Sequence, residues 1–92
     1  MKHSVYFEGK VQSLSINTAE GYATVGVMES GKYAFSTAKE ETMVVISGIL
    51  KAKLPGKDWA EFKQSDRFIV AANQSFDVEA SGEVAYICYY KS

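Results

Sequence analysis

The sequence predicts an all-β protein built as a single barrel or sandwich. Turn-forming residues recur along the chain and separate short runs rich in Val, Ile, Tyr, Phe and Thr, which is the spacing of all-β sandwiches and barrels. No window of about 11 residues carries apolar side chains at the 3.6-residue period of an amphipathic helix. About nine strands are expected, at residues 11–16, 22–28, 32–37, 43–46, 49–54, 58–62, 67–71, 76–80 and 84–90.

The first three expected strands are supported by alternating side chains and by the turns Glu20-Gly21 and Ser30-Gly31 between them. In a strand, successive side chains point to opposite faces. The third strand therefore places Tyr33, Phe35 and Thr37 on one face. The polar segment that follows, residues 38–42, is expected to form one helical turn at most.

The two middle strands are expected to differ in whether one face or both faces are covered by protein. Residues 43–46 are apolar without a break, so we expect protein on both faces. After a turn at Ser47-Gly48, the next strand alternates cleanly. Leu50, Ala52 and Leu54 should face the core, and Lys51 and Lys53 should face solvent. A further turn signal at residues 55–58 leads into the strand at 58–62.

The last strands are predicted from apolar runs on either side of the turn at Ser81-Gly82. In residues 84–90 both faces are apolar or aromatic, and Val84, Tyr86, Cys88 and Tyr90 share one of them. Such a strand is expected at the centre of a sheet or at a subunit interface, where tyrosine is enriched.

Length and charge limit the function classes. Ninety-two residues predict one domain, residues 1–92, and a modest core that dimerisation would help to stabilise. The net charge of −1 argues against a nucleic-acid binder held by phosphate contacts. Neither a membrane-spanning apolar run nor a signal-peptide pattern is visible in the sequence, so we expect a cytoplasmic protein with no membrane partner.

The single histidine and the single cysteine have ordinary interpretations. His3 lies near the N-terminus, where a surface or disordered position is expected. Cys88 has no second cysteine to pair with. We interpret it as a small buried side chain on a strand, in preference to a nucleophile.

A first motif lies between Gly31 and Gly48. Glu41 precedes the strand that ends in Ser-Gly, with six residues between Glu41 and Gly48. This arrangement resembles the first motif of the cupin β-barrels, most of which place two metal-binding histidines just before the glutamate. Here those positions hold Thr37 and Lys39, so the resemblance implies a cupin-like barrel without its metal.

A second motif follows the same layout in residues 65–79. Ala71 and Asn73 stand where the cupin pattern has proline and glycine, and Phe76 stands where it has histidine. Asparagine tolerates a positive φ, so Asn73 can still form the turn. An imidazole metal site would need histidines that these positions lack.

Together, YFEGKVQSL, ATVGVM, FSTAKEETMVVISG and YICYY resemble the small bacterial pyrimidine/purine nucleoside phosphorylases. The resemblance runs from about Tyr6 to Tyr90. It implies an all-β, single cupin-like (RmlC-like jelly-roll) β-barrel and a cofactor-free, metal-independent homodimer. It also implies an enzyme that cleaves purine and pyrimidine nucleosides with inorganic phosphate, giving free base and α-ribose 1-phosphate.

The residues can be assigned to this chemistry. Glu41 is the candidate catalytic carboxylate, because it can accept hydrogen bonds from ribose hydroxyls and favour a positively charged ring; its alternative is a surface position. Ser36 and Thr37 could donate to phosphate, or simply pair across strands. Arg67, the single arginine, and Lys39, at an expected inward position, are the candidate cations; a solvated strand end is the alternative for Arg67.

The base needs a surface on which to stack. Alternation and the motifs select Tyr33, Phe35, Phe68 and Phe76 as candidates, with plain barrel core as the alternative. Asn73 and Gln74 are candidate hydrogen-bonding residues at the rim, or ordinary turn residues.

Two other functions fit the same sequence. One is a metal-free cupin barrel that binds a small sugar or nucleotide without turnover. The other is a structural or regulatory dimer whose aromatic face is an interface. Phosphate-dependent release of free base would separate the enzyme from both.

Overall fold

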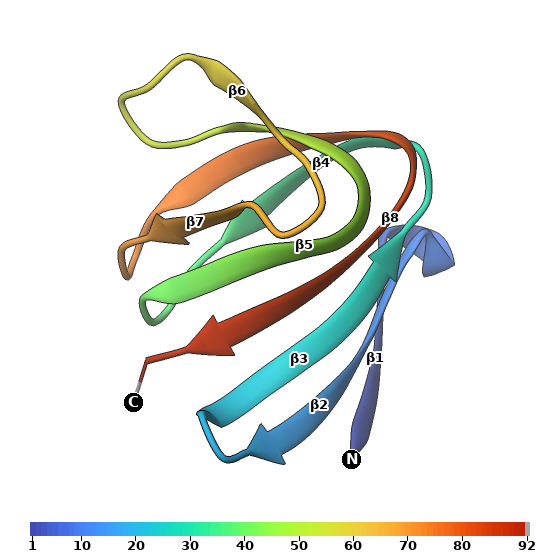
Figure 1. Cartoon of the computed structure of the whole chain (residues 1–92), viewed down its shortest axis with the longest axis vertical. Coiled ribbons are helices and arrows are strands. Elements are labelled where there is room, and N and C mark those ends of the chain that lie inside the picture. The colour runs from blue at the N-terminus through green and yellow to red at the C-terminus, as the bar shows by residue number, and fades with distance from the viewer. Residues whose placement is uncertain (92) are drawn as a thin grey trace.

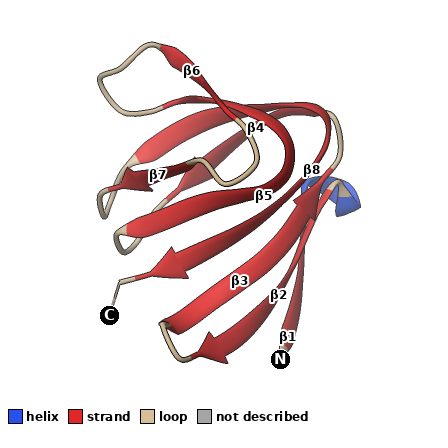
Figure 2. Cartoon of the chain, in the orientation of Figure 1, coloured by secondary structure: helices blue, strands red, loops and turns tan. Residues whose placement is uncertain are grey.

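The computed structural model describes residues 1–91, most of which lie in strands (Figure 1). The short 3-10 turn η1 is the one helical element drawn (Figure 2), and no helix in the described part of the chain is long and apolar enough to cross a membrane. The elements are β1 (Lys2–Tyr6), η1 (Phe7–Gly9), β2 (Val11–Thr18), β3 (Gly21–Met28), β4 (Gly31–Ser36), β5 (Glu41–Lys53), β6 (Trp59–Phe62), β7 (Arg67–Val70) and β8 (Ser75–Tyr90).

The strands form two layers that share the long strands β5 and β8. One layer runs β1-β2-β3-β8-β5-β7 and uses the second half of β8 with the first half of β5. The other runs β4-β8-β5-β6 and uses the remaining halves. All pairings are antiparallel, and Figure 1 shows β5 and β8 curving from one layer into the other.

The predicted all-β, jelly-roll class is confirmed, but the sheet does not close into a continuous barrel. Its hydrogen-bonded path ends at β1 and β6, with β4 and β7 as side branches. The fold is therefore a sandwich of two layers, which is how jelly rolls limit their exposed edges.

Two of the predicted turns are bends within strands, so four predicted strands are in fact two. Residues 43–46 and 49–54 both belong to β5, and 76–80 and 84–90 both belong to β8. Gly48 has φ +98°, and a Cβ there would lie 2.6 Å from the Glu83 carbonyl oxygen. Because the pairing register shifts on both sides of Ser47, β5 bulges and bends at this point without ending.

The core lies between the layers. Leu50 and Ala52 are fully buried while Lys51 and Lys53 are exposed, which confirms the predicted alternation. The expectation that residues 43–46 are covered on both faces is wrong, because Ile46 is 42% exposed. The apolar run arises because the outer face of β5 is also apolar there.

The N-terminal strand β1 was not predicted, because it is an edge strand with little burial and no apolar period. It pairs with β2 along its whole length. His3 is exposed on it, as expected, and its Nε2 lies 3.0 Å from Gln12 Oε1. Residues 38–42, expected to hold one helical turn at most, hold none: residues 38 and 39 form a bend and β5 begins at Glu41.

Candidate functional site

A cavity of about 300 Å³ opens between the two layers. It is lined by residues of β2, β3, β4, β5 and β8 and by the segment where β1 meets η1, and its β4 lining includes the exposed Ala34 and Ser36 at the rim. Its lining residues are Tyr6, Phe7, Ser13, Thr24, Ala34, Phe35, Ser36, Glu41, Met43, Phe76, Tyr86, Cys88 and Tyr90.

Glu41 is the one acidic side chain among these lining residues. It opens β5 and pairs with Tyr90 of β8 on one side and Val70 of β7 on the other. The Cys88 thiol donates a hydrogen bond to Glu41 Oε1 at 3.3 Å. Burial raises the pKa of Glu41 above its ordinary value, and the thiol hydrogen bond partly opposes that rise.

The inward face of β8 lines the cavity with two phenols and one thiol. Burial, with smaller effects from Cys88, Tyr6 and Glu41, raises the pKa of Tyr86 to about 12. Burial also raises the pKa of the Cys88 thiol and of Tyr90. All three groups are therefore uncharged at neutral pH and can donate hydrogen bonds. The Tyr90 hydroxyl already lies 3.3 Å from Thr24 Oγ1.

Aromatic rings form another wall of the cavity. The Phe35 and Phe76 centroids are 5.9 Å apart, and Phe7 meets Phe35 edge-on at 5.7 Å. Phe7 has φ +51°, which a bulky residue rarely adopts. The strained backbone places this ring against both Tyr33 and Phe35, as strained residues often do at ligand sites.

The polar part of the lining is hydroxyl-rich and has no cation. None of the described residues that line the cavity is Lys, Arg or His. Ser13, Thr24 and Ser36 offer hydroxyls, and Ser36 Oγ lies 3.3 Å from Ser75 Oγ. Within residues 1–91 no group of three or more His, Cys, Asp or Glu is placed to hold a metal.

Four of the predicted site residues meet in this cavity: Glu41, Ser36, Phe35 and Phe76. Thr37 does not line it. The Thr37 hydroxyl donates to the Ala71 carbonyl at 2.7 Å and accepts from the Gln74 N–H at 3.0 Å. These two hydrogen bonds join the β4–β5 loop to the β7–β8 turn. They occupy the Thr37 hydroxyl that a bound phosphate would need.

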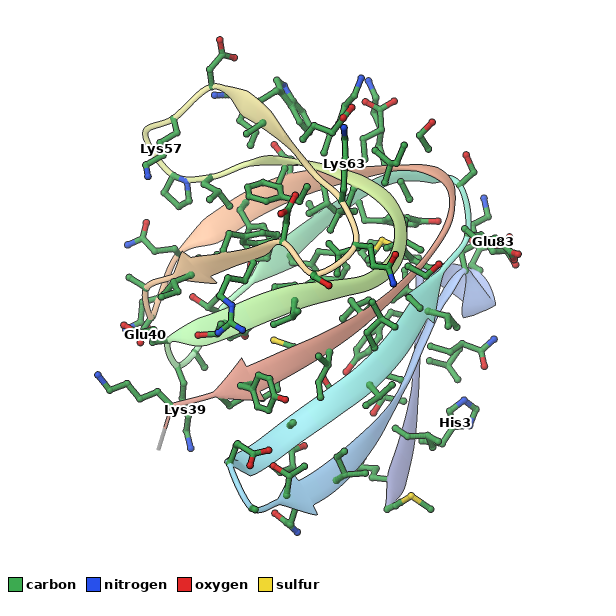
Figure 3. The ribbon with its side chains drawn as sticks, viewed as in Figure 1. His3, Lys39, Glu40, Lys57, Lys63 and Glu83 are labelled. Carbon is green, nitrogen blue, oxygen red and sulfur yellow. The ribbon has the colours of Figure 1, made fainter. Side chains whose placement is uncertain are left out.

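The two candidate cations lie outside the cavity. Arg67 is exposed on β7, whose inward side chains are Phe68 and Val70. Lys39 was expected to face the interior, but it is exposed in the β4–β5 loop and points away from the body of the protein (Figure 3). That expectation came from the cupin metal-ligand position that Lys39 occupies, but residues 38 and 39 form a bend outside the strands, which leaves the side chain exposed.

The remaining predicted residues surround the cavity without lining it. Tyr33 is buried and its hydroxyl donates to the Glu29 carbonyl at 2.8 Å. Phe68 is buried between Phe62 and Phe76. Asn73 has φ +60°, which confirms the predicted turn, and both Asn73 and Gln74 are exposed.

Sequence reasoning missed most of the lining from β8 and from the segment after β1. The alternation in residues 84–90 did group Tyr86, Cys88 and Tyr90 on one face, but it left open which face turned inward. Phe7 gave no such signal, because a left-handed backbone sets its direction, and Tyr6 ends the edge strand β1 that was not predicted.

Comparisons with known proteins agree on one family. The family model described as "Pyrimidine/purine nucleoside phosphorylase" matches residues 1–90. A protein of that name from Pseudomonas putida is 47% identical over 91 residues, covering 98% of this chain and 97% of its own. A second, from Psychrobacter cryohalolentis, is 50% identical over 86 residues and covers 92% of each chain.

Solved structures share the fold. A protein of unknown function from Vibrio parahaemolyticus superposes with a TM-score of 0.93 at 37% identity, covering 98% of this chain and 97% of that one. The cupin domain of Cnp3 from Schizosaccharomyces pombe has a TM-score of 0.67 at 16% identity, covering 88% of this chain and 61% of that one, and it supports the cupin fold alone. The chain belongs to the pyrimidine/purine nucleoside phosphorylase family.

Proposed function

We propose that this protein is a pentosyltransferase that cleaves purine and pyrimidine nucleosides with inorganic phosphate. A phosphate oxygen bonds to C1′ of the ribose as the bond from C1′ to the base nitrogen breaks. The proton given up by hydrogen phosphate ends on the base, so free base and α-ribose 1-phosphate are formed. The near full-length similarity to proteins named for this activity supports the proposal.

The observation that carries the proposal is one half-buried carboxylate, Glu41, in a cavity with an aromatic wall. Cleavage at C1′ passes through a ribosyl cation-like state. A carboxylate beside the sugar can accept hydrogen bonds from its hydroxyls and stabilise the positive ring. Burial makes that electrostatic effect larger than it would be in water.

The aromatic wall suits a base of either class. Phe35 and Phe76 present ring faces and edges without hydrogen-bonding groups. Stacking on such rings depends weakly on which base is present. We therefore propose that these two rings contact the base, which would allow both purines and pyrimidines.

Phosphate is proposed to bind through hydroxyl donors, with Ser36 as the first candidate. Ser36 is the predicted phosphate residue that lines the cavity. The exposed positions of Arg67 and Lys39 favour long-range attraction of the anion over direct contact.

The test is an HPLC assay of purified protein with uridine and adenosine, with and without phosphate, and with EDTA throughout. We expect phosphate-dependent release of uracil and adenine, and loss of that release in Glu41→Gln. Nucleoside binding without release would overturn the proposal in favour of a non-catalytic binding barrel. A Glu41→Gln variant with unchanged turnover would remove Glu41 from the site.

We further propose a cytoplasmic homodimer. The outer face of β1, β2 and β3 exposes four apolar side chains, Val5, Leu14, Val25 and Val27; Leu14 pairs directly with Val25, and Val5 and Val27 lie on either side of Gln12. Exposed patches of this kind are typical of subunit interfaces. Light scattering of the wild type and of Val27→Glu would test the dimer, and cell fractionation would test the location.

A further inference from the structure

Glu41 and Cys88 meet because β5 and β8 are neighbours with a fixed register. Glu41 pairs directly with Tyr90, and Met43 pairs with Cys88. Cys88 is thus the diagonal neighbour of Glu41 on the same inward face. This geometry brings the thiol sulfur 3.3 Å from Glu41 Oε1, at the wall of the cavity.

Within residues 1–91, the side-chain group that donates a hydrogen bond to the Glu41 carboxylate is the Cys88 thiol. The one ion pair in that part of the chain joins Lys63 and Glu61, so Glu41 has no salt-bridge partner there. The other titratable groups near the pair are the phenols of Tyr6, Tyr86 and Tyr90. A half-buried carboxylate with no cation depends on such hydrogen bonds to stay ionised.

The same surroundings make Cys88 unsuited to act as a nucleophile. It is 2% exposed, and burial together with the Glu41 carboxylate raises the pKa of its thiol. Reactive cysteines lie instead in electropositive, partly exposed surroundings, where the thiolate forms readily. Cys88 therefore keeps its proton and can only donate it in a hydrogen bond.

We propose that Cys88 is a positioning residue, whose S–H group holds the Glu41 carboxylate ionised and directed into the cavity. This inference rests on the proposed function only in giving Glu41 a ribose to hold. No covalent step involves the sulfur. Glu41 remains the residue that touches substrate.

The test compares Cys88→Ala, which removes the donor, with Cys88→Ser, which keeps a hydroxyl donor in its place. Loss of the donor should raise the pKa of Glu41, so the acidic limb of kcat/KM should move to higher pH in Cys88→Ala. At pH values on the acidic side of this limb, we expect kcat/KM of Cys88→Ala to be about fivefold lower than that of the wild type, as for a lost hydrogen bond. Cys88→Ser should keep the limb at or below its wild-type pH.

A second readout does not need turnover. The ¹³C chemical shift of the Glu41 side-chain carboxyl can be titrated in each variant, with Glu41→Gln identifying the signal. We expect Glu41 to titrate at higher pH in Cys88→Ala than in the wild type or Cys88→Ser. If the wild type proved inactive, this titration would still test the Cys88–Glu41 contact, so the two proposals fail separately.

Ile87→Ala is the matched control, because residue 87 lies on the other face of β8. It should change neither the pH profile nor the carboxyl titration. The proposal is overturned if Cys88→Ala leaves both unchanged. It is also overturned if Cys88→Ser shifts them as far as Cys88→Ala does, since the sulfur would then act through packing alone.

Discussion

Gly26→Ala should move a ring of the candidate site without replacing any polar side chain. Gly26 of β3 pairs with Tyr86 of β8, and the tyrosine ring fills the space that a Cβ would occupy. An added Cβ would lie 2.4 Å from the Tyr86 hydroxyl oxygen and 2.5 Å from Cζ. The backbone of Gly26 is outside the left-handed region, so the effect should come from this contact and not from strain.

The size of the effect follows from those distances. Ordinary contacts are 3.4–4 Å, so the end of the Tyr86 ring must move by about 1 Å. Tyr86 is 6% exposed and cannot swing into solvent, and overpacking of this kind costs about 1–3 kcal/mol of stability. A displacement of about 1 Å in a site can lower kcat/KM up to about 100-fold.

A double-mutant cycle with Tyr86→Leu tests this reasoning. Leucine lacks the atoms that the new Cβ would meet but keeps much of the apolar volume. Stability is measured by urea unfolding and activity by phosphorolysis of uridine. In the Tyr86→Leu background, Gly26→Ala should be neutral or should stabilise by up to about 1 kcal/mol, because the glycine loses chain entropy on folding.

The control is Val25→Ala, at the neighbouring position on the outer face, which should cost far less activity than Gly26→Ala. Equal destabilisation by Gly26→Ala in both backgrounds would refute the argument, because the cost would then not involve the Tyr86 ring. If Gly26→Ala reduced stability but left activity unchanged, the position of the Tyr86 ring would not matter for the reaction, although the packing argument would still hold.

Three further predictions concern other parts of the site. Thr37→Val should lower the unfolding free energy by about 1–3 kcal/mol, because it leaves the Gln74 N–H without its partner; the KM for phosphate should stay unchanged, and a raised KM would restore Thr37 as a ligand. Arg67→Ala should change stability by less than about 0.5 kcal/mol; a KM that rises for phosphate alone would show that this exposed side chain reaches the anion after all. The stability of Glu41→Gln in urea, measured relative to the wild type, should rise with pH. The reason is that the Glu41 carboxyl has a raised pKa in the folded state, so it stabilises the wild type below its unfolded pKa of about 4.3 and this stabilisation is lost as pH rises through the folded pKa. A difference in stability that is the same at about pH 4 and about pH 8 would contradict this.

Local pattern predicted some features of the site and not others. The alternation of Leu50 and Ala52 with lysines was confirmed, because side-chain direction along one strand needs no long-range information. The turn at Asn73 was likewise predictable from the residue type. The inward position of Lys39, expected from its place at a cupin metal-ligand position, was wrong, because residues 38 and 39 form a bend outside the strands.

Glycine signals were ambiguous for a related reason. Ser47-Gly48 and Ser81-Gly82 predict a change of direction, and the chain does bend at both. Whether the bend ends a strand or carries it into a second layer depends on the partner strand. At Gly48 that partner is the backbone of Glu83, which leaves no room for a Cβ.

The all-β class, the cupin-like motif around Glu41 and the family resemblance could all be recognised without a structure. These depend on residue types and on spacings along the chain, which local geometry and turn chemistry read directly. Which side chains share the cavity, in contrast, depends on how distant strands pair. Glu41 and Cys88 are 47 residues apart in the sequence and meet only because β5 and β8 pair in one register. No hairpin turn joins these two strands, so turn geometry along the chain could not set that register.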